Sequence, residues 1–168
     1  MNIRLSLTAI LMVLMAHTPG LASEANFLRT IEGDYTGKGT VKLRTNRKPI
    51  GVRCKFRSSS TPTRLSLNGS CTGLLVISRK ISASLSVSGS RYRGTYVGAG
   101  TGPASLSGKR RGSALTLNVR WAKEVNGDRD ATLTVRKVGV KGLTLTTVDR
   151  DPKTGKLITT SEIVLTRR

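Results

Sequence analysis

The sequence predicts an all-β protein: a single antiparallel up-and-down β-barrel of about 8–10 strands, with a short N-terminal helical turn and one disulfide. Two observations predict this fold class. Apolar and polar residues alternate in run after run of the chain, and short turns containing Gly, Pro or Asn separate the runs. Because each strand then has one apolar face, the sheet must close on itself or stack, and short sequential connections favour closure.

Residues 1–22 have the three-part layout of a secretory signal peptide. A single positive charge precedes an apolar run from Leu5 to Met15, and Pro19-Gly20 follows that run. The run is shorter than the roughly 20 apolar residues that a membrane-spanning helix needs. We therefore expect cleavage after Ala22 and no transmembrane segment after cleavage. The remaining residues 23–168 are expected to form one domain that is periplasmic or secreted.

The first element expected in that domain is a short helical turn over residues 23–31. Ser23 is a suitable N-cap, and Phe27, Leu28 and Ile31 fall on one side of a helical turn or two. Since this apolar side needs a partner, we expect the turn to cover one end of the barrel.

Ten alternating runs follow and are interpreted as strands. Apolar residues occupy one set of positions, as in Ile50, Val52, Cys54 and Phe56, while Lys, Arg, Ser and Thr occupy most of the alternate positions. The predicted strands lie near residues 34–44, 50–58, 63–70, 74–87 (one long strand or two short ones), 91–98, 103–109, 113–121, 130–138, 141–149 and 156–167. The turns between them carry signals such as Asn126-Gly127.

Cys54 and Cys71 are the two cysteines of the chain. In an exported protein an even pair is expected to be oxidised, and the midpoint of this pair falls within the turn signal Ser60-Thr61-Pro62-Thr63. We therefore predict a disulfide between the two cysteines, which face each other across a β-hairpin. Closing a loop of this size stabilises the fold by about 3 kcal/mol on the chain-entropy model. No C-x-x-C spacing supports a redox-active pair instead.

The start of the predicted domain resembles the calycin group of small barrels. The pattern Phe27-x-x-x-Ile31-x-Gly33-x-Tyr35-x-Gly37-x-Gly39 is similar to the opening of lipocalin-like and fatty-acid-binding-protein-like barrels, where a short helix precedes Gly-x-Trp on the first strand. Here Tyr35 occupies the usual Trp position, and no long C-terminal helix follows the barrel as it does in lipocalins. The resemblance implies a non-enzymatic carrier that holds a small apolar or amphipathic molecule inside the barrel.

Four aromatic residues are candidate ligand contacts: Tyr35, Tyr92, Tyr96 and Trp121. Tyr92 and Tyr96 share one face of a predicted strand, and their hydroxyls could serve as polar contacts for a ligand. Glycines at positions 37, 39 and 94 either leave space for that ligand or relieve crowding in a coiled barrel. We favour the second explanation of these glycines.

The chain carries a formal charge of +20, from 29 Lys and Arg against 9 Asp and Glu. On alternating strands these cations point outward. The resulting positive electrostatic field attracts polyanions. The alternative is that the charge only keeps the protein soluble. The candidate anion-binding residues are Arg53, Lys55, Arg57, Lys109, Arg110 and Arg111, the last three at a predicted hairpin tip. Few aromatics and no helix for a DNA groove argue against sequence-specific nucleic-acid binding.

Little in the sequence supports catalysis or metal binding. The single histidine, His17, lies in the predicted signal peptide, so the mature chain would lack histidine-dependent triads and metal sites. The remaining candidates are two carboxylate pairs, Asp128 with Asp130 and Asp149 with Asp151. Both pairs lie in or beside turns, with an Arg between the acids, and we interpret them as turn-forming residues. We expect no enzyme activity, metal or cofactor.

The sequence therefore predicts an exported binding protein for a small amphipathic or anionic ligand, or for an anionic component of the cell envelope. The alternative is a surface polyanion-binding protein, for lipopolysaccharide, anionic polysaccharide or nucleic acid, whose barrel is filled. The two hypotheses differ in whether the barrel interior contains a cavity.

Overall fold

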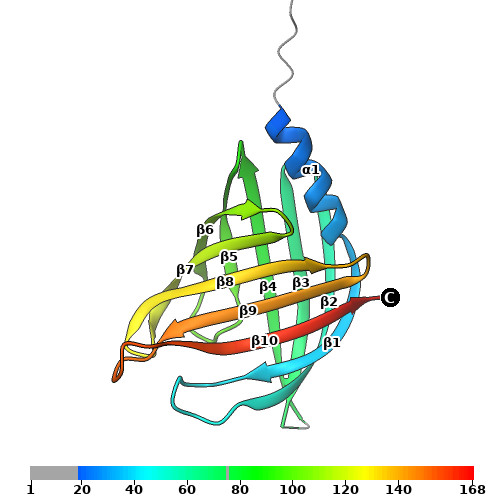
Figure 1. Cartoon of the computed structure of the whole chain (residues 1–168). Coiled ribbons are helices and arrows are strands. Elements are labelled where there is room, and N and C mark those ends of the chain that lie inside the picture. Colours follow the sequence, from blue (N-terminus) through cyan, green and yellow to red (C-terminus); the bar gives the residue numbers. More distant parts are fainter. Residues whose placement is uncertain (1–18, 75) are drawn as a thin grey trace, which may run out of the picture.

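The computed structural model describes residues 19–74 and 76–168, which form one helix and ten strands. Consecutive strands pair antiparallel, and β1 also pairs with β10, so the barrel is closed (Figure 1). The elements are α1 Pro19–Ile31, β1 Gly33–Val41, β2 Ile50–Thr61, β3 Arg64–Gly73, β4 Ile77–Ser88, β5 Arg91–Val97, β6 Ala104–Arg111, β7 Ala114–Val125, β8 Asp128–Val138, β9 Gly142–Arg150 and β10 Leu157–Arg167. The predicted fold class is confirmed.

Each predicted strand corresponds to one observed strand. The run near 74–87 forms a single strand, β4, rather than two short ones. β2 is longer than predicted because its ladder with β3 continues through polar residues as far as the Thr61–Arg64 pair. Short connections alternate between the two ends of the barrel, so the end covered by α1 is called the upper end and the opposite one the lower end (Figure 1).

α1 begins four residues before the predicted helical turn. Residues 1–18 of the predicted signal peptide lie outside the described residues, and residues 19–22 form the first part of α1. Within the described part of the chain, no helix is both long and apolar enough to cross a membrane.

The predicted disulfide is present. Cys54 on β2 lies directly opposite Cys71 on β3, and the hairpin turns at Pro62-Thr63, between the two strand ends. Both cysteines are buried in the apolar core. The bridge therefore joins two neighbouring strands from inside the barrel, as the symmetric spacing about the turn predicts.

Several glycines allow neighbouring strands to approach closely. A Cβ atom at Gly39 would lie 2.0 Å from the carbonyl oxygen of Glu162 on β10, and one at Gly94 would lie 1.9 Å from that of Ser84 on β4. Neither position has room for a side chain, because the backbone of the neighbouring strand occupies that space. These glycines thus serve the closure of the barrel rather than supplying space for a ligand.

Candidate functional site

α1 closes the upper end of the barrel with its apolar side. Phe27, Leu28 and Ile31 are buried in the core cluster, and Leu28 has no exposed surface at all. The Tyr35 hydroxyl, on β1 below the helix, donates a hydrogen bond of 2.9 Å to the Ile31 carbonyl. The helix is therefore a packed plug, and the expectation that this segment covers one end of the barrel is met.

A buried charged network holds α1 to β5 and β6. Glu24 accepts hydrogen bonds of 2.9 Å from both Nε and Nη2 of Arg110, and a third from the Tyr92 hydroxyl. Burial acts to raise the pKa of Glu24, but the bonds from Arg110 and Tyr92 hold it below its ordinary value. The Arg110 guanidinium also lies 5.0 Å from the centre of the Phe27 ring.

Contacts with α1 account for three residues that the sequence offers as binding candidates. Tyr35 and Tyr92 lie under α1 with their hydroxyls already bonded, and Arg110 is paired with Glu24. All three stabilise the closed end, away from the space described next.

The lower half of the barrel contains a cavity of about 330 Å³. Its wall is mostly apolar and comes from both sides of the barrel, as in Val52, Ile81, Val125 and Ile163. Within the described part of the chain, no helix like α1 fills the interior here, and exposed side chains of the lower loops, such as Leu43, form the mouth of the cavity. The volume and the apolar lining are those of a small-molecule site.

Tyr96 and Trp121 are the two candidate ligand contacts that line this cavity. Their rings meet edge to face, with centroids 5.9 Å apart. Burial raises the pKa of the Tyr96 hydroxyl, although the nearby Arg79 on β4 opposes this shift. Trp121 Nε1 is buried and makes no hydrogen bond of ordinary geometry with a described residue, although it lies near enough to the Asp149 carboxylate to lower the pKa of that group. The aromatic pair thus places two polar groups, the Tyr96 hydroxyl and the Trp121 N–H, in a mostly apolar wall.

Asp149 provides a buried carboxyl group in the same wall. It is only 3% exposed, and Thr160 on β10 donates a hydrogen bond to its Oδ2. Its Oδ1 has no partner among the described residues. Burial raises the pKa of Asp149, and the neighbouring Thr160, Asn126 and Trp121 oppose that shift without cancelling it. The site therefore has an acidic group whose charge is disfavoured by its surroundings.

The inward position of Asp149 differs from the turn-forming role that the sequence predicts for it. Leu143, Leu145 and Asp149 occupy alternate positions on β9 that all face the interior. This alternation in the sequence could have identified Asp149 as an inward-facing residue. Thr160 reaches the interior because the β10 register shifts between Thr159 and Ser161, and such a bulge redirects a side chain.

The other three carboxylates are turn or surface residues, as predicted. Asp151 accepts hydrogen bonds from the backbone N–H of Lys153 and Thr154 within the β9–β10 turn. Asp128 accepts one from the backbone N–H of Asp130, whose own carboxylate pairs with Arg120 at 2.6 Å. Within residues 19–74 and 76–168, no three His, Cys, Asp or Glu side chains group as a metal site requires.

Thr45 ties the lower loops together beside the cavity mouth. Its backbone N–H donates to Asn126 Oδ1 at 3.1 Å, and its hydroxyl donates to Asp151 Oδ2 at 2.7 Å. The β1–β2 loop is thereby joined to the β7–β8 and β9–β10 turns. These bonds fix the loop that carries Leu43 and Lys42, both of which line the cavity.

The remaining anion-binding candidates lie on the outer surface in two groups. Arg53, Lys55 and Arg57 are exposed on β2, where Arg57 pairs with Asp34 at 2.8 Å. Lys109 and Arg111 on β6 join Arg91 and Arg93 on β5 around a surface groove of about 590 Å³. Ser107, Thr116 and Asn118 also line this groove, and none of the described residues that line it is acidic.

The barrel has a counterpart among solved structures. The crystal structure of Rv2717c from M. tuberculosis matches 90% of this chain and 98% of that chain, with a TM-score of 0.67 and 14% sequence identity. At this identity the similarity shows the fold alone, a ten-stranded antiparallel barrel that is consistent with a calycin-like architecture at the coarse level. No protein-family model and no curated protein matches the sequence.

Proposed function

We propose that the protein is an exported, non-enzymatic binding protein that holds a small, mostly apolar molecule in the lower cavity of its barrel. The cavity itself supports this function most directly, because a filled barrel would leave only the outer surface for binding. A carrier role is also what the resemblance to lipocalin-like barrels implies. The Cys54–Cys71 disulfide is compatible with a periplasmic or secreted location.

The cavity wall indicates what kind of molecule fits. Its apolar side chains favour a hydrocarbon body, and the Tyr96–Trp121 pair offers ring edges for it to pack against. Trp121 and Asp149 each have a buried polar atom that makes no hydrogen bond of ordinary geometry with a described residue, and one of these atoms is a donor while the other is an acceptor. A hydroxyl group can accept from the first and donate to the second, so an apolar molecule with a hydroxyl end suits the site.

Fluorescence of Trp121 provides the test, since it is the single tryptophan of the chain and lines the cavity. We expect 1-decanol to change its emission saturably. Gly73 also lines the cavity, and a Cβ there would meet Val52 at 3.3 Å, so Gly73→Leu fills the cavity with only a small adjustment. This variant should weaken the binding of 1-decanol at least tenfold.

Gly51→Leu is the matched control. A Cβ at Gly51 meets nothing within 4 Å, and the residue is exposed on the outside of β2. This variant adds the same side chain to the protein and should bind 1-decanol as the unmodified protein does. Equal binding by both variants, or no saturable change in the unmodified protein, would refute a cavity site for such molecules.

The outer groove supports a second candidate function, the binding of polyanions at the surface. Arg91 lies directly opposite Lys109 across β5 and β6, and like charges in such a pair are destabilising unless an anion compensates them. Titration with tripolyphosphate tests this candidate. Arg93→Gln/Lys109→Gln should weaken binding more than Arg53→Gln/Lys55→Gln, which removes the same charge from β2. If both double variants lose the same affinity for tripolyphosphate, net charge alone explains the binding and the groove is not a specific site.

A further inference from the structure

Large apolar side chains are exposed at the lower end of the barrel, including Leu157 at the start of β10 (66% exposed). Four of them belong to the β1–β2 loop, the β3–β4 segment and the first residue of β4, and we call these four the apolar rim: Leu43 (67% exposed), Leu74 (60%), Val76 (82%) and Ile77 (56%). Three of the four also line the mouth of the cavity. Clustered exposed apolar side chains of this kind mark a surface that contacts a membrane, another protein or a ligand.

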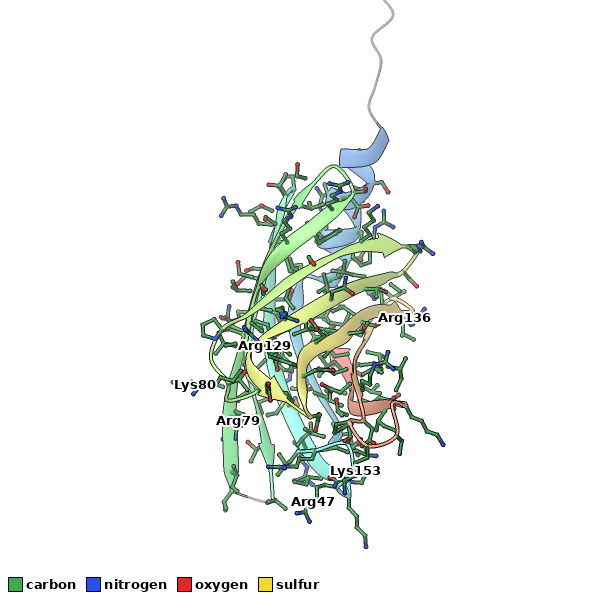
Figure 2. The ribbon with its side chains drawn as sticks, turned by 90° about the vertical axis from the view of Figure 1, so that its left-hand side faces the viewer. Arg47, Arg79, Lys80, Arg129, Arg136 and Lys153 are labelled. Atoms are coloured by element: carbon green, nitrogen blue, oxygen red, sulfur yellow. A yellow bond between two sulfur atoms is a disulfide. The ribbon has the colours of Figure 1, made fainter. Side chains whose placement is uncertain are left out.

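Cations surround this rim. We call them the basic collar: Arg44, Arg47, Lys48, Arg79, Lys80, Lys153 and Lys156, all of which are exposed. Figure 2 shows Arg47 and Lys153 at the lower end, with Arg79 and Lys80 on one flank just above it. No side chain of these seven residues forms a salt bridge or a hydrogen bond with another described residue; Lys153 and Lys156 bond only through their backbone groups. Their charges are therefore free to act on a partner.

Acidic groups at this end are few and oppose the collar only weakly. Glu124 and Asp128 flank the β7–β8 turn, whereas Asp149 and Asp151 are buried and hydrogen-bonded. The β1–β2 loop from residue 42 to 49 carries four cations and no acid. The lower end thus combines apolar tips with a surplus of positive charge.

We propose that the lower end docks on an anionic lipid bilayer, with the apolar rim in the interface and the basic collar at the headgroup phosphates. Apolar side chains that enter the interface and cations near anionic lipids each add to membrane affinity. Docking in this orientation brings the cavity mouth against the membrane. An apolar ligand then passes between bilayer and cavity without crossing water, a consequence that rests on the proposed carrier function.

A lipid surface fits these features better than a protein partner. The rim consists of separate loop tips at the open end of a barrel, and the charges around them are nearly all of one sign. A protein interface instead has a polar rim of mixed charge around a packed apolar centre. The upper end has two exposed valines, Val138 and Val140, but there α1 closes the barrel.

Vesicle co-sedimentation of the full protein tests the proposal at low salt, with equal parts phosphatidylglycerol and phosphatidylcholine. Val76→Asp and Val140→Asp form a matched pair, because the two valines are 82% and 83% exposed and lie at opposite ends. Val76 is not part of the cavity lining, so its replacement leaves the cavity unchanged. We expect Val76→Asp to weaken binding by about tenfold and Val140→Asp by less than threefold.

A second pair of variants tests the collar. Arg47→Gln/Lys48→Gln should weaken binding to the anionic vesicles by about 30-fold, whereas Arg136→Gln/Lys141→Gln near the upper end should have little effect. Vesicles of phosphatidylcholine alone should bind the unmodified protein much more weakly. Equal losses for the variants of the two ends, or no binding to anionic vesicles, would overturn the proposal.

The outcome is independent of the carrier test. If 1-decanol does not bind in the cavity but Val76→Asp weakens vesicle binding more than Val140→Asp does, the docking surface stands and the carrier function fails. If 1-decanol binds equally to Val76→Asp and to the unmodified protein while neither binds vesicles, the carrier function stands and the docking proposal fails.

Discussion

Replacing Glu24 by glutamine should loosen the helix that closes the barrel. Glu24 is buried between α1 and the barrel wall, where it accepts two hydrogen bonds from Arg110 and one from Tyr92. Glutamine keeps the shape of the side chain but offers a single acceptor oxygen, and its amide group faces the Arg110 donors. The variant therefore loses the charge and at least one acceptor at once.

The expected cost follows from this geometry. A hydrogen bond to a charged group contributes about 1.5–3 kcal/mol, and breaking a fully buried ion pair costs about 3–5 kcal/mol. The Arg110 side chain remains 17% exposed, so water can solvate part of its freed guanidinium. We therefore expect the free energy of unfolding to fall by about 2 kcal/mol, which lowers Tm by about 4–8 °C in a domain of this size.

Urea and thermal denaturation followed by circular dichroism measure this change. Glu32→Gln is the control, because Glu32 is exposed just after α1 and, among the described residues, its side chain accepts a hydrogen bond only from Ser60; this variant should cost less than about 0.5 kcal/mol. Since the pKa of Glu24 lies below its ordinary value of 4.5, its stabilisation is present above that pH and is lost as the pH falls through the lowered pKa. Equal stability of the two variants at neutral pH would refute the pinning role of Glu24.

Three further predictions concern the barrel wall. Cys54→Ser/Cys71→Ser should lower the free energy of unfolding by about 3 kcal/mol, because the disulfide closes a loop of 17 residues. Reduction of the unmodified protein should lower it by the same amount. Unchanged urea midpoints would contradict this prediction. Gly39→Ala should cost at least about 2 kcal/mol, since its Cβ would lie 2.0 Å from a carbonyl oxygen, whereas Gly51→Ala should change stability little; similar urea midpoints for both would refute the steric argument. Because the pKa of Asp149 is raised, the folded state binds this proton more tightly than the unfolded state does. The free energy of unfolding should therefore fall as the pH rises from 3.8 through the raised pKa. Asp149→Asn should remove this pH dependence, as measured by urea denaturation at a series of pH values.

Local chemistry was sufficient to predict most of the fold. Alternation identifies the strands because a strand with one buried face shows its period of two directly in the sequence. The position of the disulfide follows from a turn midway between Cys54 and Cys71. The covering of one barrel end by α1 follows from three apolar residues on one side of a short helix. Each of these inferences uses residues that are close together along the chain.

The candidate site was only partly predictable. Of the four aromatic candidates, Tyr96 and Trp121 line the cavity, and Tyr35 and Tyr92 anchor α1 instead. All four face inward, so the sequence places them in the barrel but does not say at which end. Height along the barrel axis depends on the register of ten strands together, and no single strand carries that information.

The sequence by itself determined the class of the fold, the order of its strands, the disulfide and the strongly basic surface. Only the tertiary structure decided that the interior is plugged above and hollow below. A cavity is the volume that remains after side chains from opposite walls have packed, so it depends on residues such as Val52 and Val125 that are far apart in the chain. The same reason applies to the Glu24–Arg110 pair and to the apolar rim around the cavity mouth. Closure of the barrel brings these segments together, and the local sequence of one segment does not show which other segment it will contact.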